Sequence, residues 1–312
     1  MKLTMLGTGA ALALKYYNTC FLLEEDGRYL LVDGGGGNEL LKRLKSAGAD
    51  WADIKDIFVT HKHIDHMLGI IWLIRLICNA LKKGNYRGEA RIYAHEELCA
   101  LIKNIACALL QEKESRFIGN GLYLIPVADG DKKTVFGRKI TFFDIHSSKA
   151  KQFGFSLEYA PGKKLVCCGD EPCNAFCAPH VLNADWLLHE AFCLFSQADV
   201  FKPYEKNHST VKDACETAEK LNVKNLVLYH TEDRSGGKRK ELYLKEGSAC
   251  YGGGLYIPED LESMAETMEQ AKLEESEELA EKVEEALKEK NLDKEIDITF
   301  TAQYVQLTLN GA

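Results

Sequence analysis

The stretch FVTHKHIDHMLGI, residues 58–70, places three of the chain's nine histidines and one aspartate within six positions. The preceding apolar run, Ile54–Val59, predicts a strand that ends at this cluster, and Met67–Leu81 predicts a helix directly after it. Neutral imidazoles and carboxylates are ligands suited to Zn²⁺. The stretch therefore predicts a metal site at the end of a strand, with an H-x-H-x-D-H motif made of His61, His63, Asp65 and His66.

The flanking sequence predicts a mixture of helices and strands. Some strands are separated by helices and others follow at hairpin spacing, which suggests two sheets covered by helices. Four glycines follow Asp33 and would let the backbone turn sharply there. The other predicted strands are Lys2–Leu6, Thr19–Leu23, Tyr29–Val32, Ala90–Ala94, Leu122–Val127, Lys139–Asp144, Phe153–Tyr159, Lys164–Cys168, Trp186–His189 and Asn225–Leu228. The other predicted helices are Asn38–Ser46, Glu96–Leu110 and Val211–Leu221.

Charge is distributed unevenly along the 312 residues, whose net charge is −8. From Glu259 onward there are 16 acidic and 5 basic residues, a net of −11, which leaves the first 258 residues at +3. Such a body has no strong basic patch for nucleic acid. We expect a domain of residues 1–258 and an acidic extension of residues 259–312. In the extension, apolar residues at helical spacing (Leu261–Ala286) precede an alternating, strand-like pattern (Ile296–Tyr304).

The eleven cysteines are scattered through apolar segments and form no regular framework. The first residues read directly into a strand rather than a secretory signal, so we expect reduced thiols and a cytoplasmic location. Cys173 and Cys177 lack the second pair of thiols that a structural zinc site would need. The apolar run Met67–Leu81 is shorter than a membrane span and contains Arg75, which predicts a buried helix and no membrane association.

The H-x-H-x-D-H motif after an apolar strand resembles the signature of the metallo-β-lactamase superfamily. Over roughly residues 1–258, His146 in FFDIHSS matches that superfamily's third histidine, Asp170 in LVCCGD its bridging carboxylate, and His230 in LVLYH its last ligand. The resemblance implies an α/β (α+β) protein with an αββα sandwich, followed here by a helix–strand extension. It also implies two metal ions bridged by Asp170, one held by His61, His63 and His146, the other by Asp65, His66 and His230.

Three further stretches resemble ribonuclease Z and its relatives. LTMLGTGAALALKYYNTC is similar to that group's opening strand and glycine turn, LLHEAF to its H-E-A-T segment, and NHST to its H-S-T segment. The resemblance implies that His208 faces the scissile phosphate and that Glu190 orients it. Asp65, His208 and Glu190 are therefore the expected catalytic residues. Ser209 or Thr210 would also cap the following helix, and both roles can hold at once.

The chain departs from short-form ribonuclease Z in three places. Only 23 residues separate His146 from Asp170, which leaves no room for the arm that grips tRNA. Phe192 replaces the threonine of H-E-A-T, and the G-L-P pattern after His66 is missing. These departures leave the dinuclear hydrolase intact and make tRNA a less suitable substrate.

The resemblance implies a metal-dependent hydrolase, and a phosphodiesterase in particular, in which two Zn²⁺ ions share a hydroxide. The same ligands would accept Mn²⁺ or Fe²⁺. The expected substrate is a small phosphodiester or a short oligonucleotide, and the extension could support a homo-oligomer. Two alternatives stay open: a thioesterase or lactonase of the same fold, and a metal-bound sensor without turnover.

Overall fold

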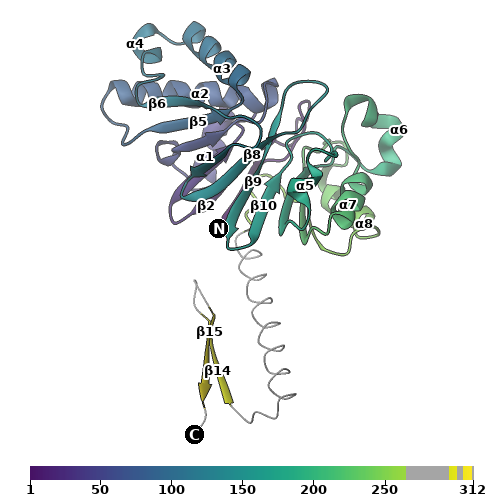
Figure 1. Ribbon diagram of the computed structural model, residues 1–312. Coiled ribbons are helices and arrows are strands. Elements are labelled where there is room, and N and C mark those ends of the chain that lie inside the picture. Colours follow the sequence, from purple (N-terminus) through teal and green to yellow (C-terminus); the bar gives the residue numbers. More distant parts are fainter. Residues whose placement is uncertain (265–294, 301–304, 311–312) are drawn as a thin grey trace. The chain divides into compact units, whose positions relative to one another are not determined.

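A computed structural model describes residues 1–264, 295–300 and 305–310 of the chain. Its contacts divide the chain into a body made of Met1 and Leu3–Ser263, and a second unit made of Lys2 and Met264–Ala312. The body ends five residues after the boundary expected at Pro258. Figure 1 shows the body as two sheets with helices on their outer sides.

The first sheet of the body has six strands in the order β1-β2-β3-β4-β5-β6. Strands β2 and β3 form an antiparallel pair, whereas β3 to β6 run parallel and are connected through helices. The strands are β1 (Lys2–Gly7), β2 (Cys20–Glu25), β3 (Arg28–Val32), β4 (Asp56–Phe58), β5 (Ala90–Ala94) and β6 (Leu122–Pro126). The helices in this half are α1 (Glu39–Ser46), η1 (Trp51–Asp53), α2 (Ile64–Lys82), α3 (Glu96–Leu109) and α4 (Glu112–Ser115).

The second sheet has seven strands in the order β13-β12-β11-β10-β9-β8-β7. It is antiparallel from β7 to β10 and parallel from β10 to β13. The strands are β7 (Lys132–Val135), β8 (Arg138–Asp144), β9 (Phe153–Ala160), β10 (Lys163–Cys167), β11 (Trp186–Glu190), β12 (Asn225–Tyr229) and β13 (Gly254–Tyr256). The helices are α5 (Ala178–Val181), η2 (Phe195–Gln197), α6 (Ala198–Phe201), η3 (Tyr204–Lys206), α7 (Val211–Lys220), η4 (Gly236–Lys238) and α8 (Arg239–Gly247).

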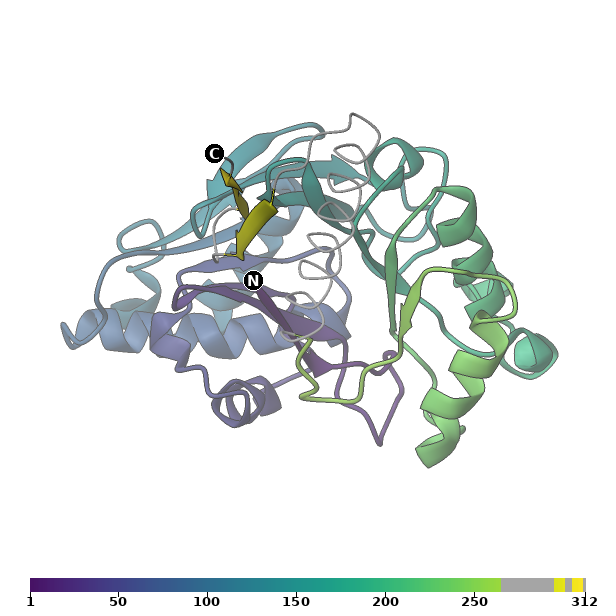
Figure 2. The ribbon, with the colours of Figure 1, turned by 90° about the horizontal axis from the view of Figure 1, so that it is seen from below.

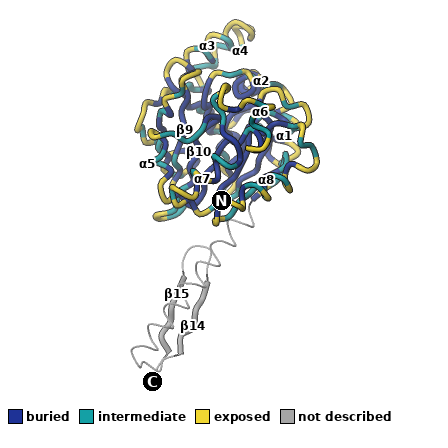
Figure 3. Tube along the Cα trace, turned by 90° about the vertical axis from the view of Figure 1, so that its right-hand side faces the viewer, coloured by how far each residue is buried: buried dark blue, intermediate teal, exposed yellow. Residues whose placement is uncertain are grey.

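The two sheets pack face to face, and Figure 2 shows the helices of each half on the outside. Phe58 of β4 meets Phe142 and Phe155 of the second sheet, with ring centroids 5.0 and 5.6 Å apart. All three rings are buried, in keeping with the buried interior along the body in Figure 3. Burying such rings is worth roughly 1.5–3 kcal/mol each, so this interface holds the halves in fixed relation.

Helix α2 begins at Ile64, three residues before the expected start at Met67. Asp65 and His66 therefore lie in the first turn of α2, where a carboxylate suits the helix dipole. By length and composition α2 could cross a membrane. More than half of that apolar stretch is buried inside the body, and the helix packs in the core of the first half. This is the behaviour of the core helix that the sequence predicts.

Other expected elements are found with small shifts of their ends. Strand β4 is shorter than the expected Ile54–Val59, and β7, β13 and α8 were not expected, because their sequences lack a clear apolar period. Leu261 lies in a turn with φ +68° and not in a helix. In the extension, β14 (Glu295–Phe300) pairs antiparallel with β15 (Val305–Asn310), so a hairpin replaces the single expected strand. Met264 also lies outside any helix, and the rest of the expected helical stripe, from Met268 to Ala286, lies outside the described residues.

Candidate metal centre and active site

Six of the seven expected ligands come together where strand ends of the two sheets meet. His61 and His63 follow β4, and Asp65 and His66 lie at the start of α2. Asp170 follows β10 and His230 follows β12, both in the second sheet. The carboxyl ends of parallel strands meet at one edge of a sheet, which brings these distant segments together.

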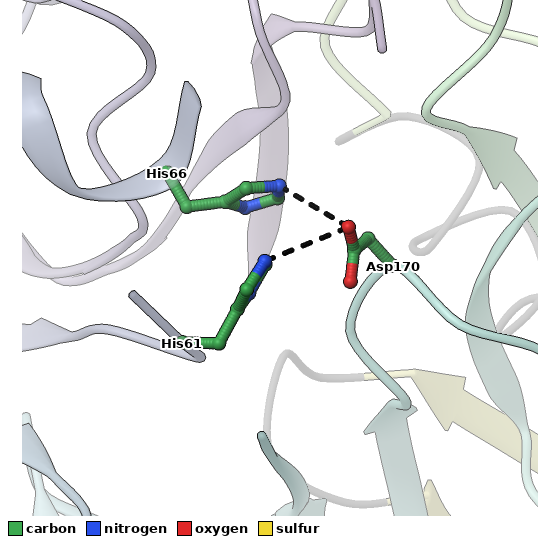
Figure 4. Close-up of side chains that lie close together, drawn as sticks. All are labelled: His61, His66 and Asp170. Atoms are coloured by element: carbon green, nitrogen blue, oxygen red, sulfur yellow. Dashed lines mark ion pairs between the residues drawn. The ribbon is translucent and has the colours of Figure 1, made fainter. Parts of the chain in front are cut away.

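Asp170 lies at the middle of this cluster. Its Oδ2 atom is 3.6 Å from Nε2 of His61, 3.6 Å from Nε2 of His66 and 3.7 Å from Nε2 of His230. Figure 4 shows His61 and His66 pointing toward the Asp170 carboxylate. Asp170 is only 4% exposed, and all three imidazoles are buried. One oxygen nearly equidistant from three histidines is the position expected of a bridging carboxylate.

Asp65 completes a second, overlapping group. Its Oδ2 atom is 3.3 Å from Nε2 of His66 and 3.6 Å from Nε2 of His230. His63 is half-buried and lies beside His61, with its Nδ1 atom 2.8 Å from Nε2 of His61. Among the described residues, three groups have the spacing of metal ligands: His61–His66–Asp170, Asp65–His66–His230 and Glu190–His208–His230.

The spacing and the unsatisfied atoms of this cluster fit divalent ions. Tetrahedral bonds of about 2.0–2.2 Å place two ligand atoms on one ion roughly 3.3–3.6 Å apart, close to the distances found here. The Nε2 atom of His66 and both ring nitrogens of His230 are buried without a hydrogen-bond partner. Leaving such atoms unpaired costs about 1–3 kcal/mol each, unless a ligand satisfies them. The residues therefore fit metal ions.

Asp33, which the sequence reading did not assign, sets the orientation of two histidines. Its carboxylate accepts from the Thr60 N–H (2.8 Å), from the Thr60 hydroxyl (2.8 Å) and from Nδ1 of His66 (2.7 Å). Because the Thr60 hydroxyl donates to Asp33, it must accept from Nδ1 of His61, 2.9 Å away. Both histidines therefore donate a hydrogen bond from Nδ1, which turns Nε2 toward the cluster.

The electrostatics of the buried cluster favour the protonation states that metal ligands need. Burial lowers the pKa of His61 well below its ordinary value, although Asp170 opposes this. Burial would raise the pKa of Asp65 and Asp170, but the neighbouring histidines lower both below the ordinary range. For His66, burial is outweighed by Asp33 and Asp65, which raise its pKa. Ionised carboxylates and a neutral imidazole are ready to bind a cation, whereas His66 would release a proton on binding.

His146 is the one expected ligand that the structure does not bring into the cluster. Its side chain is exposed, and its ring packs on Phe176 with centroids 4.0 Å apart. Its backbone N–H donates to the Asp144 carboxylate, and its φ of +53° turns the chain away from the β8 direction. A metal-binding role for His146 stays a prediction.

His208 and Glu190 lie together beside the cluster, as the sequence predicts. Nδ1 of His208 is 3.4 Å from Oε2 of the fully buried Glu190, and the His208 ring centroid is 5.1 Å from that of His230. The other Glu190 oxygen accepts from the backbone N–H and the hydroxyl of Ser209. Phe192, in place of the expected threonine, stacks on His208 with centroids 5.2 Å apart. Glu190 and Phe192 thus hold the imidazole from two sides.

The segment after His208 has the capping role as well. Thr210 is the N-cap of α7, with its side chain accepting from the Asp213 N–H in a capping box. Ser209 bonds instead to Glu190, so the two hydroxyls have different roles. Ser209 is thus held by Glu190, and Thr210 is held by Asp213.

The cluster opens into a pocket of about 600 Å³. His63, Asp65, Asp170 and His230 lie at its base. Further lining comes from His208 and from three loops, which contribute Ala11, then Ser148 and Lys149, then Tyr204, Glu205, Lys206 and Asn207. Five potential ligands or proton donors and two lysines therefore face the same space.

Comparison with known proteins identifies relatives over most of the chain. The family described as Anti-Pycsar protein Apyc1 matches residues 1–245. Ribonuclease Z of Pyrobaculum neutrophilum is 27% identical, over 85% of this chain and 98% of its own length. Ribonuclease Z of Thermococcus sibiricus is also 27% identical, over 84% of this chain and 95% of its own length. The predicted resemblance to ribonuclease Z-like proteins is confirmed.

Solved structures with a similar backbone confirm the predicted fold. The metallo-β-lactamase fold protein YhfI from Bacillus subtilis has a TM-score of 0.68 and 18% identity, covering 84% of this chain and 98% of its own. The short form of human tRNase Z has a TM-score of 0.62 and 22% identity, covering 85% and 99%. The body therefore has the metallo-β-lactamase fold.

Proposed function

This chain belongs to the Anti-Pycsar protein Apyc1 family, and we propose that it is a metal-dependent hydrolase of small phosphodiesters. The observation that carries the proposal is the position of Asp170 Oδ2, about equally far from three imidazole Nε2 atoms at the base of an open pocket. Such a carboxylate can hold two ions together. The kinship with ribonuclease Z supports phosphodiester chemistry.

One metal ion would be held by His61 and His63 and the other by Asp65, His66 and His230, with Asp170 shared between them. When bound, two divalent ions would polarise a phosphoryl oxygen and make water nucleophilic near neutral pH. The same ligands accept Zn²⁺, Mn²⁺ or Fe²⁺.

The rest of the pocket suits an anionic group. Lys149 and Lys206 both line it, and their positive charge would attract a phosphodiester more strongly than a neutral ester or lactone. His208 faces the same pocket with Glu190 beneath it. We assign His208 the role of stabilising developing charge on the phosphoryl group or protonating the leaving oxygen, and Glu190 the role of orienting it.

A small substrate is favoured over a folded RNA. Between His146 and Asp170 the chain forms a short loop, β9, a tight turn and β10, so this segment carries no projecting arm. The first 258 residues have a net charge of only +3. Binding a folded tRNA draws on many phosphate contacts, which such a surface supplies poorly.

The first test compares bis-p-nitrophenyl phosphate, a thioester and a lactone with one zinc-loaded preparation. The variant His208→Ala should keep its metals, because His208 is not among the assigned ligands, and should lose phosphodiester turnover by roughly 10²–10⁴-fold. His180→Ala is the matched control, since the ring of His180, in α5, stacks on Phe143 of β8 and lies outside the pocket lining. Faster turnover of the thioester or lactone, or unchanged phosphodiester turnover without His208, would refute the assignment.

The second test concerns substrate size. Small cyclic and linear phosphodiesters, a short oligonucleotide and precursor tRNA should be compared at fixed salt concentration, because phosphate contacts depend strongly on salt. We expect the small substrates to be hydrolysed faster. Efficient removal of tRNA 3′ trailers would contradict the size argument, and binding without turnover of any of these substrates would favour a metal-bound sensor.

A further inference from the structure

A buried carboxylate next to Asp170 connects the two walls of the pocket. Glu171 is 4% exposed, and it is neither a pocket-lining residue nor a member of the ligand groups among the described residues. Its Oε1 atom accepts from the Ser147 hydroxyl at 2.5 Å, and its Oε2 atom accepts from Nδ2 of Asn207 at 2.7 Å. The Asn207 amide also donates to the Ser148 hydroxyl at 3.3 Å.

These bonds reach two loops that are far apart in sequence. Ser147 and Ser148 belong to the loop after β8, which places Lys149 in the pocket. Asn207 belongs to the segment after η3 and directly precedes His208. Glu171, which directly follows Asp170, thus connects the pocket wall that contains Lys149 with the pocket wall that contains His208.

Both loops need such an external anchor. His146 and Asn207 have φ values of +53° and +54°, in the left-handed region that costs most L-residues roughly 1–2 kcal/mol and that asparagine and histidine adopt more readily. Glu171 accepts hydrogen bonds from Asn207 itself and from Ser147, the residue after His146, and so supports both turns. Without them, each loop would be free to relax to other conformations.

We propose that Glu171 is a positioning residue that fixes the separation of the two pocket walls and the placement of His208 relative to the metal ligands. The proposal rests on the proposed phosphodiesterase function of the same pocket. Glu171 does not touch substrate; it acts through Ser147 and Asn207. Misplacing a reacting group by about 1 Å can cost on the order of 10²-fold in rate, so this positioning has a measurable consequence.

The test is a set of four variants in zinc-loaded protein: Glu171→Ala, Asn207→Asp, Glu171→Gln, and the double variant with Glu171→Gln and Asn207→Asp. Glu171→Ala removes both bonds, and Asn207→Asp sets two carboxylates against each other. Each should keep the wild-type metal content while kcat/KM for bis-p-nitrophenyl phosphate falls roughly 10–100-fold. Glu171→Gln alone should lose less, because the Asn207 amide can turn to accept from glutamine.

The double variant is the decisive member of this set. There the glutamine donates to the new aspartate, the bond is restored with its direction reversed, and most of the activity lost in Asn207→Asp should return. A merely structural role predicts a lower melting temperature with unchanged kcat and KM per metal-loaded chain. Glu25→Ala is the control for that outcome, because Glu25 pairs with Arg138 at the end of β2 opposite the pocket.

Amide hydrogen exchange supplies a readout that does not depend on turnover. In Glu171→Ala and Asn207→Asp, exchange should accelerate in residues 146–151 and 204–208 together, with little change in the sheets. Wild-type kinetics in Asn207→Asp, failure of the double variant to recover, or unchanged exchange in both loops would overturn the proposal. An inactive wild-type protein whose loops still loosen in these variants would instead refute the phosphodiesterase function and leave the positioning role standing.

Discussion

The substitution Asp33→Asn is expected to weaken metal binding although Asp33 is not a metal ligand. In the wild-type protein the Asp33 carboxylate can only accept hydrogen bonds, and it accepts three within 2.8 Å. This forces His66 to donate from Nδ1, and through Thr60 it forces His61 to do the same. Each Nε2 atom therefore faces the cluster, where it can bind a cation.

Asparagine reverses this pattern while keeping the shape of the side chain. Its oxygen can still accept from the Thr60 N–H, but its NH₂ group must donate where the second carboxylate oxygen accepted. In the best remaining hydrogen-bond pattern, Nδ1 of His66 and Nδ1 of His61 must each accept a hydrogen bond. The ring proton of each histidine then moves to Nε2. A metal would have to displace those protons, so we expect affinity to fall by roughly 10–100-fold, as for other partners that orient metal-binding histidines.

Asp33→Ala separates this tautomer effect from simple loss of support. Alanine leaves both rings free to choose their tautomer, so metal affinity should fall less than in Asp33→Asn. Stability should fall more, because three buried donors lose their acceptor and because φ at position 33 is +57°, which asparagine tolerates better than alanine. Losing one charge-assisted bond costs about 1.5–3 kcal/mol, or roughly 3–12 °C in Tm for a body of this size.

Two measurements decide the outcome. Competition against a chelator at fixed pH gives the metal affinity, and thermal melting in chelator gives the stability of the metal-free protein. We expect the affinity order wild type, Asp33→Ala, Asp33→Asn, and the stability order wild type, Asp33→Asn, Asp33→Ala. Asp53→Asn, an exposed residue of η1, is the control and should match the wild type. Wild-type affinity in Asp33→Asn would refute the tautomer argument.

Three further outcomes are expected. Asp170→Ala should lose activity and at least one metal by elemental analysis, whereas Asp53→Ala should lose neither; two metals retained without Asp170 would contradict a bridging role. Burial alone would raise the pKa of Glu25, but the hydrogen bond and charge of Arg138 lower it below its ordinary value of 4.5. The pair with Arg138 therefore stabilises the folded protein fully above about pH 4.5, and this contribution is lost as the pH falls through the lower folded pKa of Glu25. Chemical denaturation between about pH 5 and 3 should show that the free energy of unfolding falls more steeply in the wild type than in Glu25→Gln. A chain ending at Ser263 should keep the body folded but show a different number of associated chains in sedimentation, or a different Tm, if the extension packs or self-associates; the same association state and the same Tm would contradict that role.

The sequence by itself determined the fold family and most of the candidate metal ligands. His61, His63, Asp65 and His66 fall within six positions, so their proximity needs no tertiary contact. The apolar strand before them and the apolar helix after them also follow from local periodicity, because the side chains on one face of an element repeat at a fixed interval. Asp170 and His230 could be added because the order of motifs along the chain resembles a known family.

Tertiary structure decided how these groups are oriented. Asp33 lies 27 residues before Thr60 and 33 before His66, and the spacing of those residues gives no sign of their hydrogen bonds. The placement of His146 on Phe176 likewise depends on a contact across 30 positions. Periodicity reports only which face of a helix or strand is apolar, so it cannot register a contact between loops that follow different strands.

Glu171 shows the same division most clearly. As the residue after Asp170 it is only one more acidic position in the sequence, and its partners Ser147 and Asn207 are ordinary loop residues. The folded chain buries its carboxylate and gives it two donors from the same half, 24 and 36 positions away. Residue types and local spacing thus determine which ligands the chain carries, whereas the pairing of buried polar groups, which only the packed sheets impose, decides where each ligand points.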